Sequence, residues 1–164
     1  MDQNFVFCLF CETSQEHKVE TFLQNIGFNV ISALVERIIF KNGKQVLEKR
    51  AIIPGYVFFE HDHEPDWNNI CKYKYIHYPL HYMDKSKCLR KNDLDFINWL
   101  KINKGTIKIS KAINIGNKIK IIEGPLKELE GKIVKINKKQ KCAGVKIDGE
   151  GINNVIWLSY EHIV

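Results

Sequence analysis

The hydrophobic positions follow two different patterns along the chain, and the change comes near residue 113. Before it, short apolar stretches typical of strands alternate with segments whose apolar residues recur every three or four positions, as in helices. After it, apolar residues occur only in short runs, mostly Ile and Val, which Gly or Lys- and Asn-containing turns interrupt. The pattern therefore predicts two units of different architecture.

The first unit opens with a predicted strand over residues 5–10 and an amphipathic helix over residues 14–26. Thr13 and Glu16 have the spacing of a capping box at the helix start, and Gly27 is suited to end the helix. The apolar stripe of the helix, at positions i, i+3, i+4 and i+7, consists of Val19, Phe22, Leu23 and Ile26. This stripe predicts a helix that packs on a sheet.

A β-hairpin is expected next. Residues 28–40 have strand-like composition, and residues 45–53 form the returning strand. Asn42-Gly43 between them favours a tight type I′ turn. The basic residues on this hairpin can form a solvated rim or touch phosphates, and we favour the rim. They are Lys41, Lys44, Lys49 and Arg50.

The stretch that follows is predicted to be a turn at Pro54 and Gly55 that leads directly into a strand. Because side chains alternate along a strand, Tyr56 and Phe58 share one face, and the next residues, Val57 and Phe59, share the other. Both faces are apolar. The strand is therefore either central in a sheet with both faces buried, or it presents an apolar face to a partner.

Two more helices complete the first unit. Pro65 is expected at the first position of a short helix, because its fixed φ suits a helix start. Asn92 is expected to cap a longer helix, which ends at Asn103-Lys104-Gly105. Residues 104–113 are then predicted to be a partly ordered connector.

The second unit is predicted to be a small barrel of five short strands. Gly116 and Gly124 are expected at tight turns, and Gly131 at a position where a side chain would collide. The residues expected to fill the interior are Ile119, Ile121, Ile133 and Ile136. The fold class is therefore α+β, with an antiparallel sheet and packed helices in residues 1–103, a linker in residues 104–113, and a β-barrel in residues 114–164.

Charge strengthens the division into two units. Residues 1–100 contain 12 Lys and Arg against 13 Asp and Glu, whereas residues 101–164 contain 13 Lys against 6 Asp and Glu. A basic block on a neutral body is typical of proteins with a nucleic-acid or ribosomal partner. A lysine-rich composition without such a partner is the alternative interpretation.

The sequence predicts no catalytic residues, no metal site and no cofactor. It contains no Ser/His/Asp order, P-loop or paired-carboxylate pattern. A metal or thiol enzyme built on His61, His63, Cys8 and Cys11 is the competing hypothesis, but a lone CxxC on a predicted strand is more typical of structural cysteines. The five cysteines do not suggest a disulfide framework. Neither a signal peptide nor a membrane span is indicated, so we expect a cytoplasmic protein.

Two motifs in this order resemble the NusG family of transcription elongation factors, in which an NGN domain precedes a KOW domain. The first is Pro54-Gly55-Tyr56-Val57-Phe58, and the second is the run over residues 115–136, which includes Ile115-Gly116-Asn117-Lys118 and Leu129-Glu130-Gly131-Lys132. The resemblance covers nearly the whole chain and implies an NGN-type sheet followed by an SH3-like KOW barrel. It departs from the family at Glu128, where many members have Gly.

The resemblance also implies a function. In the family, the NGN domain docks on the clamp helices of the β′ subunit of RNA polymerase, and Pro54, Tyr56 and Phe58 fall on that docking surface. The factor bridges the polymerase cleft, close to the DNA of the elongation complex, and limits pausing, while catalysis stays with the polymerase.

Within the family, the chain is most similar to the specialised LoaP-type antiterminators, particularly over residues 123–126 and 135–143. This implies a processive antiterminator whose KOW domain binds a hairpin in leader RNA. Lysines of the barrel would contact the RNA phosphates. They are Lys118, Lys120, Lys132, Lys135, Lys138, Lys139 and Lys141. The alternative is a housekeeping NusG that links polymerase to Rho or ribosomal protein S10.

Overall fold

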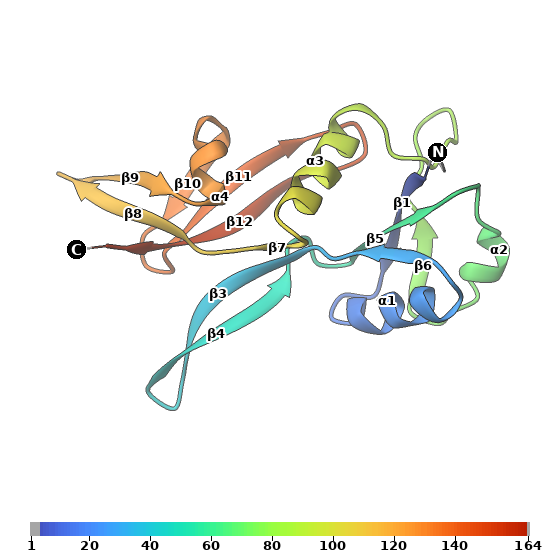
Figure 1. Cartoon of the computed structure of the whole chain (residues 1–164), viewed down its shortest axis with the longest axis horizontal. Helices are drawn as coiled ribbons and strands as arrows, with labels where there is room; N and C mark the ends of the chain where they lie inside the picture. Colours follow the sequence, from blue (N-terminus) through green and yellow to red (C-terminus); the bar gives the residue numbers. More distant parts are fainter. Residues whose placement is uncertain (1–3, 164) are drawn as a thin grey trace.

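In the computed structural model, which describes residues 4–163, a four-stranded antiparallel sheet forms the N-terminal unit (Figure 1). The strand order is β2-β5-β1-β6, so β5 lies in the interior of the sheet. The strands are β1 (Phe5–Cys11), β2 (Asn29–Ile31), β5 (Tyr56–His61) and β6 (Ile76–Pro79). Val164, the end of the predicted barrel, lies outside the described residues.

Helices cover both faces of this sheet. One face, with Phe7 and Phe59, packs against Val19 and Leu23 of α1 (Glu16–Asn25) and against Ile70 of α2 (Trp67–Ile70). The other face carries Val6, Cys8 and Phe58 and packs against Phe96, Ile97 and Leu100 of α3 (Lys91–Ile102). The strand β5 is thus buried on both sides, as one of the two sequence interpretations predicted.

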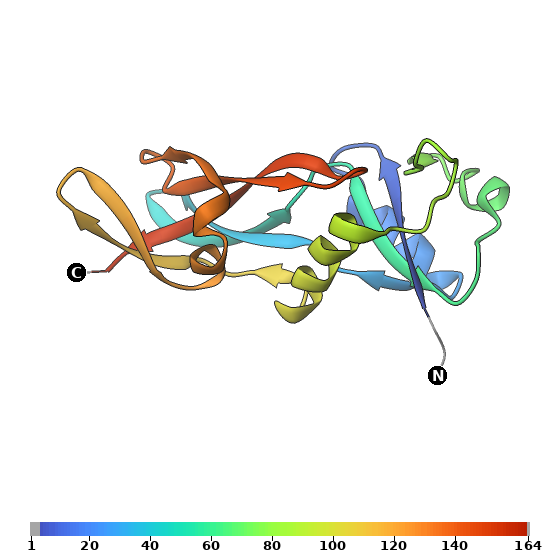
Figure 2. The same ribbon diagram turned by 90° about the horizontal axis from the view of Figure 1, so that it is seen from above.

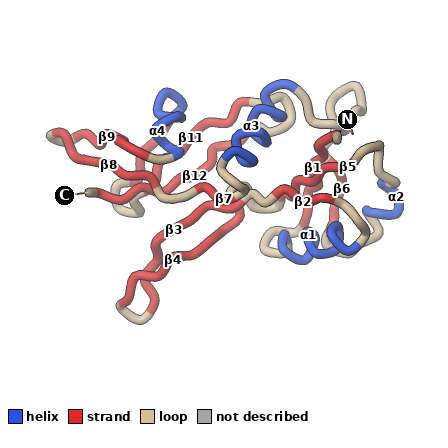
Figure 3. Tube along the Cα trace, viewed as in Figure 1, coloured by secondary structure: helices blue, strands red, loops and turns tan. Residues whose placement is uncertain are grey.

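A long hairpin extends from the N-terminal unit (Figures 1 and 3). Its strands are β3 (Leu34–Lys41) and β4 (Lys44–Ala51), which pair in register from Leu34↔Ala51 to Lys41↔Lys44. The predicted turn is confirmed, because Asn42 and Gly43 both have positive φ, as a type I′ turn requires. β7 (Thr106–Ile107) pairs in parallel with the base of β3.

The C-terminal β unit, residues 110–162, is a five-stranded sheet of order β10-β11-β12-β8-β9 with two short helical turns. Its strands are β8 (Ser110–Ile115), β9 (Lys118–Glu123), β10 (Ile133–Asn137), β11 (Cys142–Asp148) and β12 (Asn153–His162). The helical turns are α4 (Pro125–Glu128) and η1 (Glu130–Lys132). The predicted α+β class and the five strands are confirmed, and the expected connector 104–113 contains β7 and the first part of β8.

One hydrophobic core joins the two units. It runs from Phe58 of the N-terminal sheet through Phe96 and Leu100 of α3 to Val145 and Ile156 of the C-terminal β unit. Seen from above, α3 crosses between the sheet and the strands β11 and β12 (Figure 2). None of the helices in the described part is long and apolar enough to cross a membrane.

Three predicted helix starts are wrong, two of them because the predicted capping side chain makes another contact. Helix α1 begins at Glu16 without a side-chain cap, and the Glu16 carboxylate accepts the N–H of Gly55 instead of completing a capping box. The short helix α2 is capped by Asp66, so Pro65 precedes the cap. Asn92 lies inside the first turn of α3, where its side chain donates to the carbonyl of Asp148. The predicted ends at Gly27 and Gly105 are confirmed, both with positive φ.

Two details of the predicted barrel are also wrong. A Cβ at Gly131 would meet open space rather than collide. Ile136 is 36% exposed, whereas Ile121 is buried and Ile119 and Ile133 are packed against the core. The interior is filled instead by residues from β11 and β12, which lie in the middle of the sheet.

The turn before α4 yields a stability prediction. Gly124 has a φ of +106°, and an added Cβ would lie 2.7 Å from the Cα of Ser110. We expect Gly124→Ala to lower the free energy of unfolding by about 3 kcal/mol, from strained backbone and steric overlap together. Urea denaturation would measure the change.

Gly116→Ala is the matched control. Gly116 also has positive φ, but its Cβ would meet nothing within 4 Å. Gly116→Ala should therefore lower the free energy of unfolding by only about 1 kcal/mol, from backbone strain. Equal losses in the two variants would contradict the close approach at Ser110.

Candidate functional site

The predicted docking residues lie beside the contact between the two units. Pro54 is exposed, Tyr56 is half-buried, and Phe58 is only 1% exposed. Phe58 packs edge-on against Phe96 of α3, with ring centroids 6.2 Å apart. The hydroxyl of Tyr56 donates to Oδ1 of Asn154 at the start of β12, at 3.3 Å. The face of β5 that the sequence predicted for docking is therefore covered by α3 at Phe58 and contacted by the C-terminal β unit at Tyr56.

An aromatic cluster remains partly accessible at the edge of this face. The ring of Phe10 lies edge-on to Tyr56 at 4.8 Å and to Tyr78 at 5.1 Å. Tyr78 is 55% exposed. Sequence reasoning missed Phe10 and Tyr78, because they belong to β1 and β6 and only the sheet order brings them beside β5. Burial raises the pKa of the Tyr56 hydroxyl, so this group stays protonated and able to donate.

A buried carboxylate holds the two units together. Asp93, in the first turn of α3, is completely buried and accepts three hydrogen bonds. Its Oδ2 accepts from the N–H of Gly151 at 2.8 Å and from the hydroxyl of Tyr82 at 2.6 Å, and its Oδ1 accepts from the N–H of Ile152 at 2.8 Å. These bonds satisfy a charge whose burial would otherwise cost several kcal/mol.

Glycines in the β11–β12 turn, residues 149–152, make this approach possible. A Cβ at Gly149 would overlap Oδ1 of Asp93, and one at Gly151 would lie 3.0 Å from Oδ2. The sequence Asp148-Gly149-Glu150-Gly151 was the available signal, but it indicates only a turn. This local sequence does not reveal that the turn binds the carboxylate of Asp93, which lies 55 positions or more earlier in the chain.

Arg90 reinforces the contact at its solvent edge. Its guanidinium pairs with Glu150 of the turn at 3.1 Å and with Asp84 at 2.9 Å, and it lies over the ring of Tyr82 at 4.1 Å. The pKa of the Asp84 carboxyl is lowered by hydrogen bonds from Ser86 and Arg90. Burial and the hydrogen bond to Asp93 raise the pKa of Tyr82, which keeps its hydroxyl a donor.

The seven predicted RNA-binding lysines lie on the surface of the C-terminal β unit. All seven are exposed, and in the described part of the chain none forms an ion pair with a carboxylate. They come from β9, η1, β10 and the β10–β11 turn. Lys138 donates to the carbonyl of Asn117 at 2.7 Å, which brings the β8–β9 and β10–β11 turns together. The lysines thus add positive charge around the outer strands of one small unit.

The residues of the competing enzyme hypothesis do not form one site. Cys8 and Cys11 point to opposite faces of β1 and belong to different core clusters, so they cannot pair with each other. Burial raises the pKa of both thiols, that of Cys11 to about 12, so neither is a ready thiolate. His61 and His63 do lie close, with 3.3 Å between their Nε2 atoms, and Asp62 lies between them on an exposed turn. These three ligand-type side chains are hydrogen-bonded to one another.

A family model described as "Transcription termination factor nusG" matches residues 6–97, which is more than half of the chain. Among solved structures, one titled "Domain interaction in Thermotoga maritima NusG" is similar at 17% identity and a TM-score of 0.47. That match covers 96% of this chain and 94% of the Thermotoga chain. No curated protein matches the chain.

The contact at Asp93 generates a stability prediction. Asp93→Asn keeps the size of the side chain but turns one acceptor oxygen into an NH2 group that faces a backbone N–H. We expect the free energy of unfolding to fall by about 3 kcal/mol. Amide hydrogen exchange at Gly151 and Ile152 should accelerate in the same variant.

Asp95→Asn is the control, because Asp95 lies on the same helix but is exposed. It should change stability by no more than about 0.5 kcal/mol. If both variants behave alike, Asp93 does not hold the turn.

Proposed function

Because the chain belongs to the NusG family, we propose that it is a transcription elongation factor that acts as a processive antiterminator on a specific operon. In this proposal the N-terminal unit binds RNA polymerase and the C-terminal β unit binds leader RNA. The polymerase carries out all the chemistry, and the factor changes how the polymerase responds to pauses and terminators.

The observation that supports an RNA-binding role most is the set of seven exposed lysines without carboxylate partners. Neutralising phosphates releases bound counterions, so such a surface contributes affinity that falls as salt rises. Lys111 and Lys127 of the same unit are instead paired with Glu123 and Glu130. The seven lysines support the role because they are gathered on one small unit, in a stretch, residues 101–164, that contains 13 Lys against 6 Asp and Glu.

In this proposal, Pro54, Tyr56 and Phe58 of this protein contact the β′ clamp helices of the polymerase. Phe58 is covered by Phe96 of α3, and the hydroxyl of Tyr56 is bonded to Asn154 of β12, so a helix that contacts Tyr56 has to displace the C-terminal β unit. The hydrogen bonds to Asp93 and the ion pair between Arg90 and Glu150 are the contacts that would break. Binding at β5 and docking of the C-terminal β unit would then compete for one surface.

A second candidate function is supported by apolar side chains on the C-terminal β unit. Several aliphatic residues there are between 36% and 60% exposed: Ile115, Ile122, Val134, Ile136 and Val155. Such residues suit a protein partner, as in a housekeeping factor that links polymerase to Rho or ribosomal protein S10. A leader-dependence experiment separates the two functions.

The experiment is transcription by a purified bacterial polymerase on a template with the leader beside this protein's own gene, followed by intrinsic terminators. We expect readthrough to rise only when the leader is present. Replacing Lys118, Lys120, Lys132 and Lys135 together by Gln should abolish this rise, because these side chains would contact RNA phosphates. Altered pausing or a changed Rho response without leader dependence would instead support the housekeeping function.

Polymerase binding is tested with Tyr56→Ala. To separate loss of contact from loss of docking, the substitution is made in the Asp93→Asn background, where the C-terminal β unit is already loosened. We expect affinity for core polymerase to fall about tenfold or more, as is usual for a central aromatic residue of an interface. Tyr75→Ala, a tyrosine that packs with the opposite face of the sheet, is the control. Unchanged affinity in Tyr56→Ala would remove this residue from the interface.

A further inference from the structure

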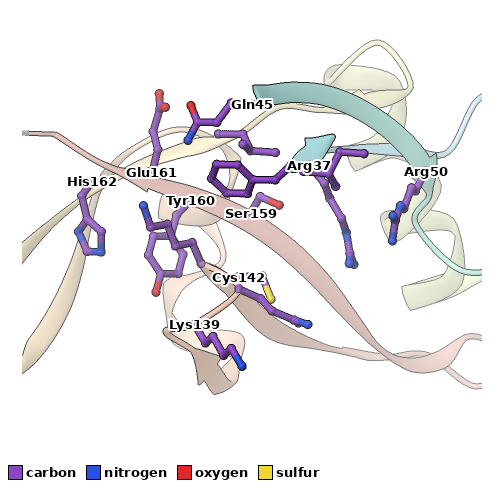
Figure 4. A pocket seen from close by; sticks show the side chains of 14 residues that line it. Arg37, Gln45, Arg50, Lys139, Cys142, Ser159, Tyr160, Glu161 and His162 are labelled. Carbon is purple, nitrogen blue, oxygen red and sulfur yellow. The ribbon is translucent and has the colours of Figure 1, made fainter. Parts of the chain in front are cut away.

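A groove lies between the β3–β4 hairpin and the C-terminal β unit (Figure 4). Its volume is about 560 Å³, within the range of clefts that hold small ligands. One wall is the hairpin, from Arg37 to Phe40 with Gln45 and Arg50. The other wall is formed by residues 139–142 of the β10–β11 turn and by residues 159–162 of β12. The groove exists only because the two units are docked.

The groove is strongly basic. Arg37 and Arg50 reach into it from the hairpin, and Lys139 lies on the opposite wall (Figure 4). With Lys141, four cationic side chains line it, and Glu161 is the one acidic residue among the lining residues. Arg50 is paired with Glu48 at 2.6 Å, whereas Arg37 has no carboxylate partner in the described part of the chain. Converging cations from two units favour an anionic ligand.

Three polar atoms of the lining residues are buried without a hydrogen-bond partner. They are Nε of Arg37, the hydroxyl of Tyr160 and Nδ1 of His162. Tyr160 is only 1% exposed, and burial raises the pKa of its hydroxyl, which therefore remains a donor. A buried donor without an acceptor costs about 1–3 kcal/mol. Nε of Arg37 and the hydroxyl of Tyr160 are donors, so a ligand with acceptor oxygens would give both of them partners.

An exposed aromatic ring lies beside these charges. Phe40, at the outer end of β3, lines the groove and is 72% exposed. Proteins that bind single-stranded nucleic acids combine cationic side chains for the backbone with aromatic rings on which bases stack. A single strand offers both its phosphates and its bases to such a surface, whereas the bases of a duplex are stacked inside it.

We propose that this groove binds a single-stranded segment of RNA, with phosphates at Arg37, Arg50, Lys139 and Lys141 and a base stacked on Phe40. This assignment rests on the proposed RNA-binding function and extends it to the N-terminal unit. It also reverses the interpretation of Arg50 as part of a solvated rim. Because the ligand would touch both units, it would stabilise their docked arrangement by linkage.

The test measures binding of a fluorescein-labelled 12-nucleotide oligouridine by fluorescence anisotropy, with the full-length protein. We expect the Arg37→Gln/Arg50→Gln variant to bind about tenfold more weakly and with a shallower salt dependence. We expect Phe40→Ala to lower the affinity for the oligouridine about fivefold or more, because a base loses its stacking partner. Lys44→Gln/Lys49→Gln is the matched control, because it removes the same charge from the same hairpin but outside the groove. Its affinity for the oligouridine should fall by less than about twofold.

The outcomes also separate this inference from the proposed function. If the Lys118, Lys120, Lys132 and Lys135 variant loses leader RNA while the groove variants keep oligouridine affinity, the groove assignment is overturned and the proposed function stands. If the control lysine variant loses as much as the arginine variant, binding is only by net charge and the assignment also fails. Equally tight binding of a uridine mononucleotide would overturn the strand assignment and make the groove a nucleotide site.

A second measurement does not depend on affinity. Photocrosslinking of 4-thiouridine RNA, followed by peptide mapping, should recover the peptide that contains Phe40 together with one from residues 139–142. Urea denaturation of each variant checks that it is folded. Crosslinks confined to other parts of the protein would contradict the proposal even if every variant bound weakly.

Discussion

The arrangement of this protein depends on a buried charge. The carboxylate of Asp93 lies at the start of α3 with no exposure to solvent, and its acceptor positions are filled by the N–H groups of Gly151 and Ile152 and by the hydroxyl of Tyr82. A carboxylate in this position is tolerated only while those donors are present. The β11–β12 turn is therefore held against α3, and the shared core forms around that contact.

Docking of the two units has opposite effects on two surfaces. It brings Asn154 of β12 to the hydroxyl of Tyr56 on β5, the strand expected to meet polymerase, while Phe58 of the same strand packs against Phe96 of α3. At the same time it brings the β3–β4 hairpin beside β12 and so builds the basic groove. Under these proposals, docking builds the RNA groove and occupies the hydroxyl of Tyr56.

Positive charge and apolar area are both available on the C-terminal β unit. Its exposed lysines suit a polyanion, and its exposed aliphatic residues suit a protein surface. The two features are compatible, because a factor that travels with polymerase can hold RNA with one part of a small domain and a protein with another. Which of them dominates is decided by leader dependence rather than by the fold.

The sequence by itself determined the local structure and the family. A continuous run of apolar, β-forming residues predicted β5, Asn42-Gly43 predicted the hairpin turn, and the change in pattern near residue 113 separated the helix-containing unit from the five-stranded one. Only the tertiary structure decided the caps and the site, because both depend on residues distant in the chain. Glu16 accepts a hydrogen bond from Gly55, Asn92 donates one to Asp148, and Asp93 accepts one from Gly151 in the β11–β12 turn. Local patterns specify which backbone groups need partners, but packing selects the partner.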